Sequence, residues 1–387
     1  MTKKKWKKDI IQAEIKIDLI IKKKSDHMIQ NKFIYNKNRN LQVPIFMPDA
    51  TRGLIKLLSS RELKDSGIEA LVVNAYHLHL QPGTEIIKKA GGIHSFMNWD
   101  RPILSDSGGF QIFSLIYNNP KMGKIMPDKV IFKSPLDGQE IEFTPERSIQ
   151  IQFDLGVDMM VCLDDCPPNS ARPEDVRSSV QRTIEWARKC KNEYEKQIKK
   201  RKISNNSRPL LFSVVQGGND IKLRKQCAQE LQNIGFDGYG FGAMPLDAEG
   251  KFNVRLLKKV AEFIPDNSLK FALGVGNPEN IVKCRDLGWD MFDCVIPTRE
   301  GRHGKLMFRK AENRLRSLNF YYSLNIGNTK FKKDFSSINT NSRIKELNEY
   351  SKAYLHHLFK IKDPLGYRLA SLNNLEFYSR LLKELKM

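Results

Sequence analysis

Residues 144–166 read TPERSIQIQFDLGVDMMVCLDDC, and this stretch contains one full unit of the pattern that decides the fold. Thr144 is a suitable helix N-cap with proline at the first helical position, and we expect the helix to end near Gly156. The apolar run that follows is continuous rather than alternating, which is typical of a strand buried on both faces. That strand ends in two adjacent carboxylates, Asp164 and Asp165. The stretch therefore predicts a helix, a buried strand and a polar strand end.

The same unit recurs along the chain. Other short apolar runs that end in polar or Gly-rich residues are ALVVNAYH (70–77), PILSDSGGFQ (102–111), LLFSVVQGG (210–218), GYGFGAM (238–244), FALGVGNP (271–278) and MFDCVIPTR (291–299). Buried strands that alternate with helices favour an α/β fold, a (β/α)8 TIM barrel in which all polar strand ends lie on one face. An open doubly wound sheet is the alternative, although the chain has no phosphate-binding G-x-G-x-x-G turn.

The rhythm of the pattern changes at both ends of the chain, which predicts three parts. We expect a basic, strand-containing N-terminal extension over 1–40, a catalytic barrel over 41–310 and an appended C-terminal helical subdomain over 311–387. In the last part, SRIKELNEYSKAYLHHLFK and NNLEFYSRLLKELK have the spacing of amphipathic helices.

The formal net charge of +21 is concentrated at the two ends. Residues 1–40 carry twelve Lys and Arg against four acids, and residues 301–387 carry eighteen against seven. Solvated termini that keep the protein in solution are one explanation. Contacts with the phosphates of a polyanionic partner are the other.

Several protein classes are excluded by the composition. No apolar run is long enough to span a membrane, and the N-terminus MTKKKWKKD does not read as a secretory signal, so we expect a cytoplasmic protein. The cysteines form no C-x-x-C pair and no cluster with histidine, which argues against disulfides and against a zinc site. They are Cys162, Cys166, Cys190, Cys227, Cys284 and Cys294.

Carboxylates follow three of the predicted strands. They are Asp106 in LSDSGG, the pair Asp164 and Asp165, and Asp293 in MFDCV. Any one of them could be a helix N-cap or a structural salt bridge. Several carboxylates on one barrel face suit a displacement at an anomeric carbon, where one acid is the nucleophile and another moves protons.

Groups that suit a flat heterocycle flank these acids. Gln216 offers an amide that both donates and accepts, and the Gly-containing stretches SGG (107–109) and GFGA (240–243) let backbone N–H groups approach a ligand. Phe110 and Leu273 are candidates for the two faces of a stacking slot, with an ordinary core position as the alternative for Phe110.

Basic residues follow the strand of Asp293. Arg299, Arg302 and Lys305 in PTREGRHGK lie just beyond its end, where they could meet phosphates beside a reacting nucleotide. A solvated basic loop is the alternative.

From about Pro44 to the C-terminus the chain resembles the tRNA-guanine transglycosylases, specifically the bacterial queuine tRNA-ribosyltransferase type. The motifs are LSDSGGFQIFSL, FTPERSIQIQFDLGVDMMVCLDDC, LFSVVQGG, GFDGYGFG, LGVGNPENIV and DMFDCVIPTREGRHG. The resemblance implies a barrel that exchanges the wobble guanine of tRNAs with GUN anticodons for a 7-deazaguanine, in queuosine biosynthesis. It also implies a double displacement through an aspartyl-ribose intermediate.

The resemblance assigns roles to the candidate residues. It implies that Asp293 is the nucleophile, that Asp106 is the general acid and base, and that Asp164 holds the N1–H and 2-amino edge of the base. Gln216 and the backbone around Gly242 and Ala243 would read O6. The remaining base-binding positions are Ser107, Gly108, Gly109, Phe110, Cys166, Met244 and Leu273. Cys166 resembles the bacterial type and favours 7-aminomethyl-7-deazaguanine as the base.

The anticodon would be held by residues that follow three of the predicted strands. These tRNA-binding positions are Asn74, Gly274, Val275, Gly276, Asn277, Asn280, Thr298, Arg299 and Arg302. The resemblance also allows a homodimer.

The chain departs from the family in two places. The family's C-terminal zinc ligands are replaced by Ser342, Ile344, Leu347 and Asn373, so we expect no metal and no other cofactor. The base-sensing stretch reads GAMPLDAEG, one residue longer than the family pattern, and Pro245 has no N–H to offer the base.

Four alternatives remain open for the activity. The chain could be a queuine-salvaging enzyme, an archaeosine-type or DNA-modifying transglycosylase, or a non-catalytic RNA-binding subunit. A non-catalytic subunit is expected to lose the acids, whereas Asp106 and Asp293 are both present. The archaeosine type usually carries further C-terminal RNA-binding domains.

Overall fold

The apolar runs of the sequence form eight short parallel strands in one sheet. The structure, a computed structural model, describes residues 33–36, 39–247, 249–310, 312–317 and 319–387. From the second strand onward each strand pairs with the next one along the barrel, the last strand pairs with the first, and a bridge between Asp49 and Val72 connects the first strand to the second. The strands are β3 (Ile45–Pro48), β4 (Leu71–Asn74), β5 (Ile103–Asp106), β9 (Met159–Val161), β10 (Leu210–Val215), β11 (Gly238–Phe241), β12 (Leu269–Ala272) and β13 (Met291–Cys294). The expected α/β TIM barrel is confirmed.

Side chains alternate between the barrel interior and the surrounding helices. In β3, Met47 lies in the interior core, whereas its neighbour Phe46 packs on the outer side against Tyr378. Interior residues from the other strands include Val72 and Met291. Because both faces of each strand are buried, the strands appear in the sequence as continuous apolar runs.

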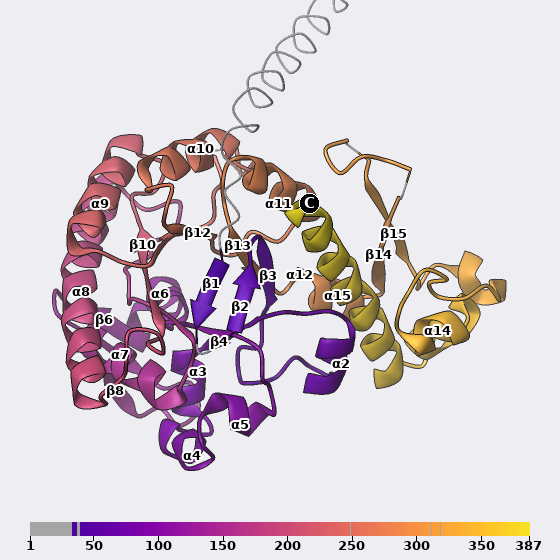
Figure 1. Ribbon diagram of the computed structural model, residues 1–387, viewed down its shortest axis with the longest axis horizontal. Helices are drawn as coiled ribbons and strands as arrows, with labels where there is room; N and C mark the ends of the chain where they lie inside the picture. Colours follow the sequence, from indigo (N-terminus) through magenta and orange to yellow (C-terminus); the bar gives the residue numbers. More distant parts are fainter. Residues whose placement is uncertain (1–32, 37–38, 248, 311, 318) are drawn as a thin grey trace, which may run out of the picture.

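Helices cover the outside of the barrel (Figure 1). They are α2 (Ser60–Asp65), α3 (Ala75–Leu80), α4 (Thr84–Lys89), α5 (Ile93–Met97), α6 (Gly109–Asn118), α7 (Pro145–Leu155), α8 (Pro173–Lys200), α9 (Ile221–Ile234), α10 (Val254–Phe263), α11 (Pro278–Asp286) and α12 (Ile296–Arg302). The caps of α7 are those expected: Thr144 Oγ1 accepts from the N–H of Arg147 at 3.0 Å, and Gly156 ends the helix with a φ of 73°.

Two small antiparallel sheets are added to the barrel. A three-stranded sheet follows α6 and the 3-10 helix η1 (Pro120–Met122), and it consists of β6 (Gly123–Ile125), β7 (Val130–Lys133) and β8 (Glu140–Phe143). A hairpin of β1 (Phe33–Asn36) and β2 (Arg39–Gln42) precedes β3. Leu41 and Val43 belong to the interior core, so the end of this hairpin closes the barrel where its strands begin. Most of the expected 1–40 extension, residues 1–32 and 37–38, lies outside the described residues.

The C-terminal part of the chain lies beside the barrel and ends in a long helix (Figure 1). It contains β14 (Lys305–Arg309), β15 (Tyr321–Asn325), η2 (Thr329–Lys333), α13 (Lys345–Glu349), α14 (Lys352–Lys360) and α15 (Pro364–Lys386). Asn374 of α15 donates to the carbonyls of Pro297 at 3.0 Å and Lys305 at 2.9 Å, and it accepts from the N–H of Met307 at 2.9 Å. These bonds join α15 to α12 and β14, and therefore to the strand end that carries Asp293.

Within the part of the chain that the structure describes, no helix has both the length and the apolar content needed to cross a bilayer.

Candidate active site

Polar side chains occupy the last interior position of several barrel strands. Asp106 and Asp293 each follow by two residues an interior apolar side chain, that of Leu104 or Met291. Because side chains alternate along a strand, both carboxylates are directed toward the barrel axis at the ends where the strands finish. The expected placement of these acids on one face is thereby explained by strand geometry.

Asp293 lies at the end of β13 and is partly buried. Its Oδ1 accepts a hydrogen bond from the N–H of Gly274 at 2.8 Å. The pKa of Asp293 is raised to about 8, mainly by burial and also by the negative charges of Asp49 and Asp106, while the Gly274 bond opposes the rise. The carboxylate thus has little stabilisation from the protein, a state that suits a nucleophile.

Asp106 has more hydrogen-bond donors. The amide of Asn74 donates to its Oδ2 at 2.8 Å, and the backbone N–H groups of Ser107 and Gly108 also donate to it. Burial and the charge of Asp49 raise the pKa of Asp106 to about 6 despite these bonds. Asn74 therefore orients Asp106, and its expected contact with the anticodon stays a prediction.

The adjacent acids after β9 have different environments. Asp164 accepts a hydrogen bond from the Gln216 amide at 2.7 Å, and burial raises its pKa to about 7. Asp165 is fully buried and pairs with Arg182, while the Tyr117 hydroxyl lies 3.4 Å from it. Asp165 therefore has a structural partner, whereas Asp164 and Gln216 together present an acceptor and an amide to a ligand.

Glycines allow this polar pair to lie close to the backbone. A Cβ at Gly242 would lie 2.3 Å from Nε2 of Gln216, so only glycine leaves room for that amide. At Gly108, with a φ of 88°, a Cβ would lie 2.4 Å from the Cβ of Tyr76, and one at Gly109 would meet the carbonyl of Asp164 at 3.0 Å. The expected close approach of these backbones is therefore a packing requirement.

The candidate stacking residues differ in exposure. Phe110 is 56% exposed at the start of α6, so it is not a core residue, and Leu273 follows β12 and is partly exposed. Both are therefore free to contact a ligand. Cys166 is buried, and burial raises the pKa of its thiol to about 12, which keeps it protonated.

The base-sensing stretch adopts an unusual backbone at Ala243, whose φ is 66°. The carbonyl of the following residue, Met244, accepts from the N–H of Leu246 at 2.8 Å and from the Asn169 amide at 3.2 Å. Any group of a base that donates to this carbonyl therefore competes with the exposed side chain of Asn169.

Apart from Asn74, the expected tRNA-binding residues lie on α12 or in the segment after β12. Arg299 is exposed on α12, and Arg302 is partly buried on the same helix with its pKa lowered by burial and by the charge of Arg299. Val275 and Thr298 are buried, and their expected contact with RNA stays a prediction. The remaining positions after β12 are Gly274, Gly276, Asn277 and Asn280, of which Asn277 caps α11.

The structure adds two residues that the sequence did not indicate. Asp49, one residue after β3, contributes a negative charge that raises the pKa of both Asp106 and Asp293. Arg224, on α9, is fully buried, and within the described part of the chain it donates to three carbonyl oxygens, those of Val215, of Gly218 at 2.9 Å and of Gly242 at 3.0 Å. Its guanidinium joins the strand ends of β10 and β11, which are followed by Gln216 and Gly242.

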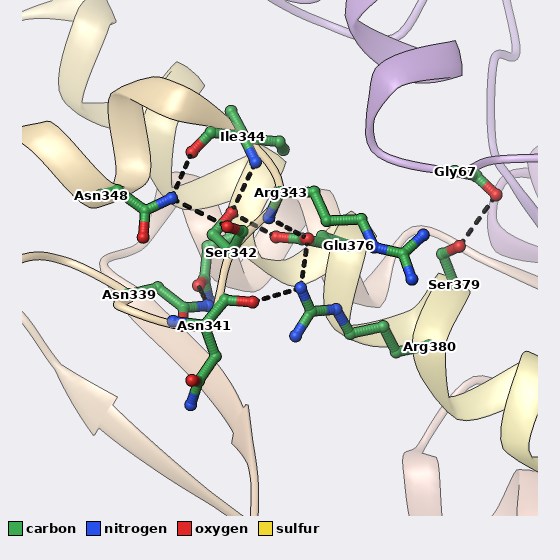
Figure 2. A network of polar contacts seen from close by, with 11 residues as sticks. Gly67, Asn339, Asn341, Ser342, Arg343, Ile344, Asn348, Glu376, Ser379 and Arg380 are labelled. Atoms are coloured by element: carbon green, nitrogen blue, oxygen red, sulfur yellow. Dashed lines mark hydrogen bonds and ion pairs between the residues drawn. The ribbon is translucent and has the colours of Figure 1, made fainter.

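The positions of the family's zinc ligands are taken up by packing and by a polar network. Ile344 and Leu347 are buried in the apolar core of the C-terminal part, and Asn373 donates to the carbonyl of Met307 at 3.1 Å. The hydroxyl of Ser342 donates to the carboxylate of Glu376 (Figure 2).

Glu376 is the centre of this network (Figure 2). Besides Ser342, it accepts from the N–H of Arg343 and from the guanidinium of Arg380, each at 2.7 Å. Structural zinc sites in proteins are built from four thiolate and imidazole ligands, and this network, with one carboxylate and no cysteine or histidine, does not fit such a site. Among the described residues, no group of three or more His, Cys, Asp or Glu is placed to hold a metal ion.

Comparisons with known proteins cover almost the whole chain. A family model described as queuine tRNA-ribosyltransferase matches residues 32–387. A queuine tRNA-ribosyltransferase of Methylacidiphilum infernorum is 38% identical over 346 residues, which are 89% of this chain and 88% of that protein. That of Natranaerobius thermophilus is 39% identical over 346 residues, with 89% and 87% covered. That of Francisella tularensis subsp. novicida is 37% identical over 372 residues, with 96% and 94% covered.

Proposed function

Because the chain belongs to the queuine tRNA-ribosyltransferase family of pentosyltransferases, we propose that it exchanges the wobble guanine of GUN-anticodon tRNAs for a 7-deazaguanine. The observation that carries the proposal is the arrangement of Asp106 and Asp293 on the same face of the barrel, beside the Asp164–Gln216 pair. Two acids for the sugar and one amide–carboxylate pair for a base are what such an exchange requires.

In the first step, the carboxylate of Asp293 attacks C1′ of the ribose. The new C–O bond forms as the bond from C1′ to N9 of guanine breaks, and the electron pair of that bond remains on the base. Asp106 donates its proton to the base, so guanine leaves as a neutral molecule. The products are a ribosyl ester on Asp293, an ionised Asp106 and free guanine.

The second step runs the same chemistry with another base. The ionised Asp106 takes the N9 proton of the incoming 7-deazaguanine, and N9 attacks C1′ as the ester bond to Asp293 breaks. Both acids return to their starting protonation states, so the enzyme is ready for another cycle without a further reactant.

The base would be recognised by Asp164 and Gln216. The carboxylate of Asp164 can accept from the N1–H and 2-amino group of a guanine-like base. The Gln216 amide has two hydrogens, so it can keep its bond to Asp164 and donate the second hydrogen to O6. Adenine presents neither donor at N1 nor an acceptor at position 6, so this pair selects guanine and its 7-deaza analogues.

For the physiological base we propose 7-aminomethyl-7-deazaguanine. Pro245 has no N–H, so the only polar group of the Met244–Pro245 peptide is the Met244 carbonyl, which an amine can satisfy and a nitrile cannot. An incoming amine would replace Asn169 as a donor to that carbonyl. We also propose that the enzyme acts without zinc, since the Glu376 network and the apolar side chains of Ile344 and Leu347 occupy the family's ligand positions.

An exchange assay with labelled guanine tests the proposed function. Purified protein should incorporate label into an unmodified GUN tRNA and into neither a DNA duplex nor the same tRNA with adenine at the wobble position. Asp106→Asn and Asp293→Asn should each abolish incorporation. Label in DNA, or in a tRNA position outside the anticodon, would support a DNA-modifying or an archaeosine-type enzyme instead, and no label at all would support a non-catalytic subunit.

A further inference from the structure

We propose that Asp49 is a third carboxylate of the active site and accepts a hydrogen bond from the 2′-hydroxyl of the nucleotide that reacts. The proposal rests on the transglycosylase function proposed above and deepens it, because it makes Asp49 a residue that selects RNA over DNA. Asp49 belongs to none of the motifs that predicted the other site residues.

The backbone places Asp49 between the strands of the two acids. Asp49 directly follows β3, which pairs on one side with β13, where Met47 lies opposite Asp293. On its other side Asp49 itself pairs with Val72 of β4, two residues before the asparagine that donates to Asp106. Asp49 is therefore flanked by the nucleophile and by the residues that orient the acid.

Strand alternation directs the Asp49 side chain into the barrel. Met47, two residues earlier on the same strand, and Val72, the paired residue on the neighbouring strand, both lie in the interior core. Side chains two apart on one strand, and side chains of paired residues on adjacent strands, point to the same face. The carboxylate of Asp49 thus lies in the layer directly above the interior core, where a substrate must enter.

Asp49 is the acid of this site that has no donor. Asp106, Asp164 and Asp293 each accept a hydrogen bond from a neighbouring amide or N–H, whereas none of the described residues donates a hydrogen bond to Asp49 or forms an ion pair with it. Burial raises the pKa of Asp49 to about 6, which reflects this lack of partners. A partly buried carboxylate without a donor is unfavourable, and a donor supplied by the substrate would remove that penalty.

One hydroxyl of the substrate meets this requirement. In an RNA chain the 3′ and 5′ oxygens of an internal nucleotide are esterified to phosphate, so the 2′-hydroxyl is the only hydroxyl donor on its ribose. This hydroxyl is bonded to the carbon next to C1′, the atom that Asp293 attacks. A carboxylate that neighbours Asp293 is therefore in the position to accept from it.

The test compares two RNA stem-loops that carry the target guanine on ribose or on 2′-deoxyribose. For the wild type, loss of the 2′-hydroxyl should lower kcat/KM about ten- to a hundredfold, as expected for one hydrogen bond to a charged group. For Asp49→Ala, the two substrates should differ by less than about threefold, because the acceptor is absent in both cases. Asp49→Asn retains an uncharged acceptor and should give an intermediate ratio, and it replaces the alanine variant if that variant does not fold.

Asp158→Asn is the matched control, since Asp158 is a fully buried carboxylate at the opposite end of the barrel, where it accepts from the N–H of Ile103 at 2.9 Å. This control should keep the wild-type ratio even if it lowers stability. Equal discrimination by wild type and Asp49→Ala, or no discrimination by the wild type, would overturn the role of Asp49 and leave the transglycosylase function standing. Failure of the wild type to exchange guanine in the all-RNA stem-loop would instead refute the proposed function itself, and the role of Asp49 with it.

Discussion

The ionisation of Asp106 and Asp293 should set the pH dependence of exchange. The double displacement needs Asp293 ionised and Asp106 protonated, so the productive pair carries one proton. Burial raises the pKa of Asp106 to about 6 and that of Asp293 to about 8, and between these values the pair carries one proton. We therefore expect a bell-shaped profile of kcat/KM, which reports the free enzyme, with its maximum near pH 7.

The sign of each limb follows from the proton count. Below about pH 6 the pair takes up a second proton and the nucleophile is lost, and above about pH 8 the last proton leaves and the acid is lost. The basic limb should fall about tenfold per pH unit, and the acidic limb should be steeper, because Asp164, whose pKa burial raises to about 7, must also be ionised to accept from the base. Because Asp293 has the higher pKa, most of the singly protonated pair holds its proton on Asp293. Only about one hundredth holds it on Asp106, which is the productive form, so substrate binding must move the proton from Asp293 to Asp106.

Asp49→Asn is the perturbation that tests this electrostatic origin. The charge of Asp49 raises the pKa of both Asp106 and Asp293, so its removal should move both limbs to lower pH. The assay measures initial rates of labelled guanine incorporation at subsaturating tRNA, from pH 5 to pH 9 at constant ionic strength, with Asp158→Asn as the control. A flat wild-type profile, or limbs that stay in place in Asp49→Asn, would refute the reasoning.

Three further predictions concern other parts of the molecule. Arg224→Met should raise KM for the base about ten- to a hundredfold with a smaller change in kcat, because it leaves the carbonyls beside the proposed base site without their donor. Arg208→Met is the control and should affect stability alone, since its partner Asp237 lies at the opposite end of the barrel, where the strands begin. Elemental analysis of the purified protein should find no zinc. Glu376→Gln should lower the free energy of unfolding by about 2 to 4 kcal/mol, whereas Glu349→Gln, at an exposed position, should lower it by less than about 0.5 kcal/mol. The nitrile base should be about ten- to a hundredfold poorer in kcat/KM than the aminomethyl base, and Pro245→Ala should reduce the difference; equal use by the wild type would contradict this.

The strand ends of the barrel could be predicted from the sequence because buried parallel strands appear as continuous apolar runs. Asp106 and Asp293 follow such runs directly, and their position after two strands was sufficient to place them on one face. The sequence could not distinguish Asp164 from Asp165, because only the three-dimensional packing shows that Arg182 neutralises the second of the pair.

Asp49 and Arg224 could not be predicted for related reasons. Asp49 follows the short run PIFMP, and its importance depends on β3 lying between β13 and β4, a neighbourhood created by barrel closure. Arg224 occurs in the basic stretch IKLRKQC, where it resembles the solvated lysines around it. Its burial depends on the packing of α9 against β10, and the local sequence does not indicate that contact.

Isolation of a ribosyl ester on Asp293 is the most direct measurement of the proposed chemistry. Wild-type protein is mixed with a GUN-anticodon stem-loop, denatured, and digested with protease and nuclease before mass spectrometry. We predict that the peptide containing MFDCVIPTR carries one nucleotide lacking its base, attached through Asp293, and that Asp293→Ala neither forms this adduct nor exchanges guanine. An adduct on another residue, or continued guanine exchange by Asp293→Ala, would contradict the assignment of Asp293 as the nucleophile.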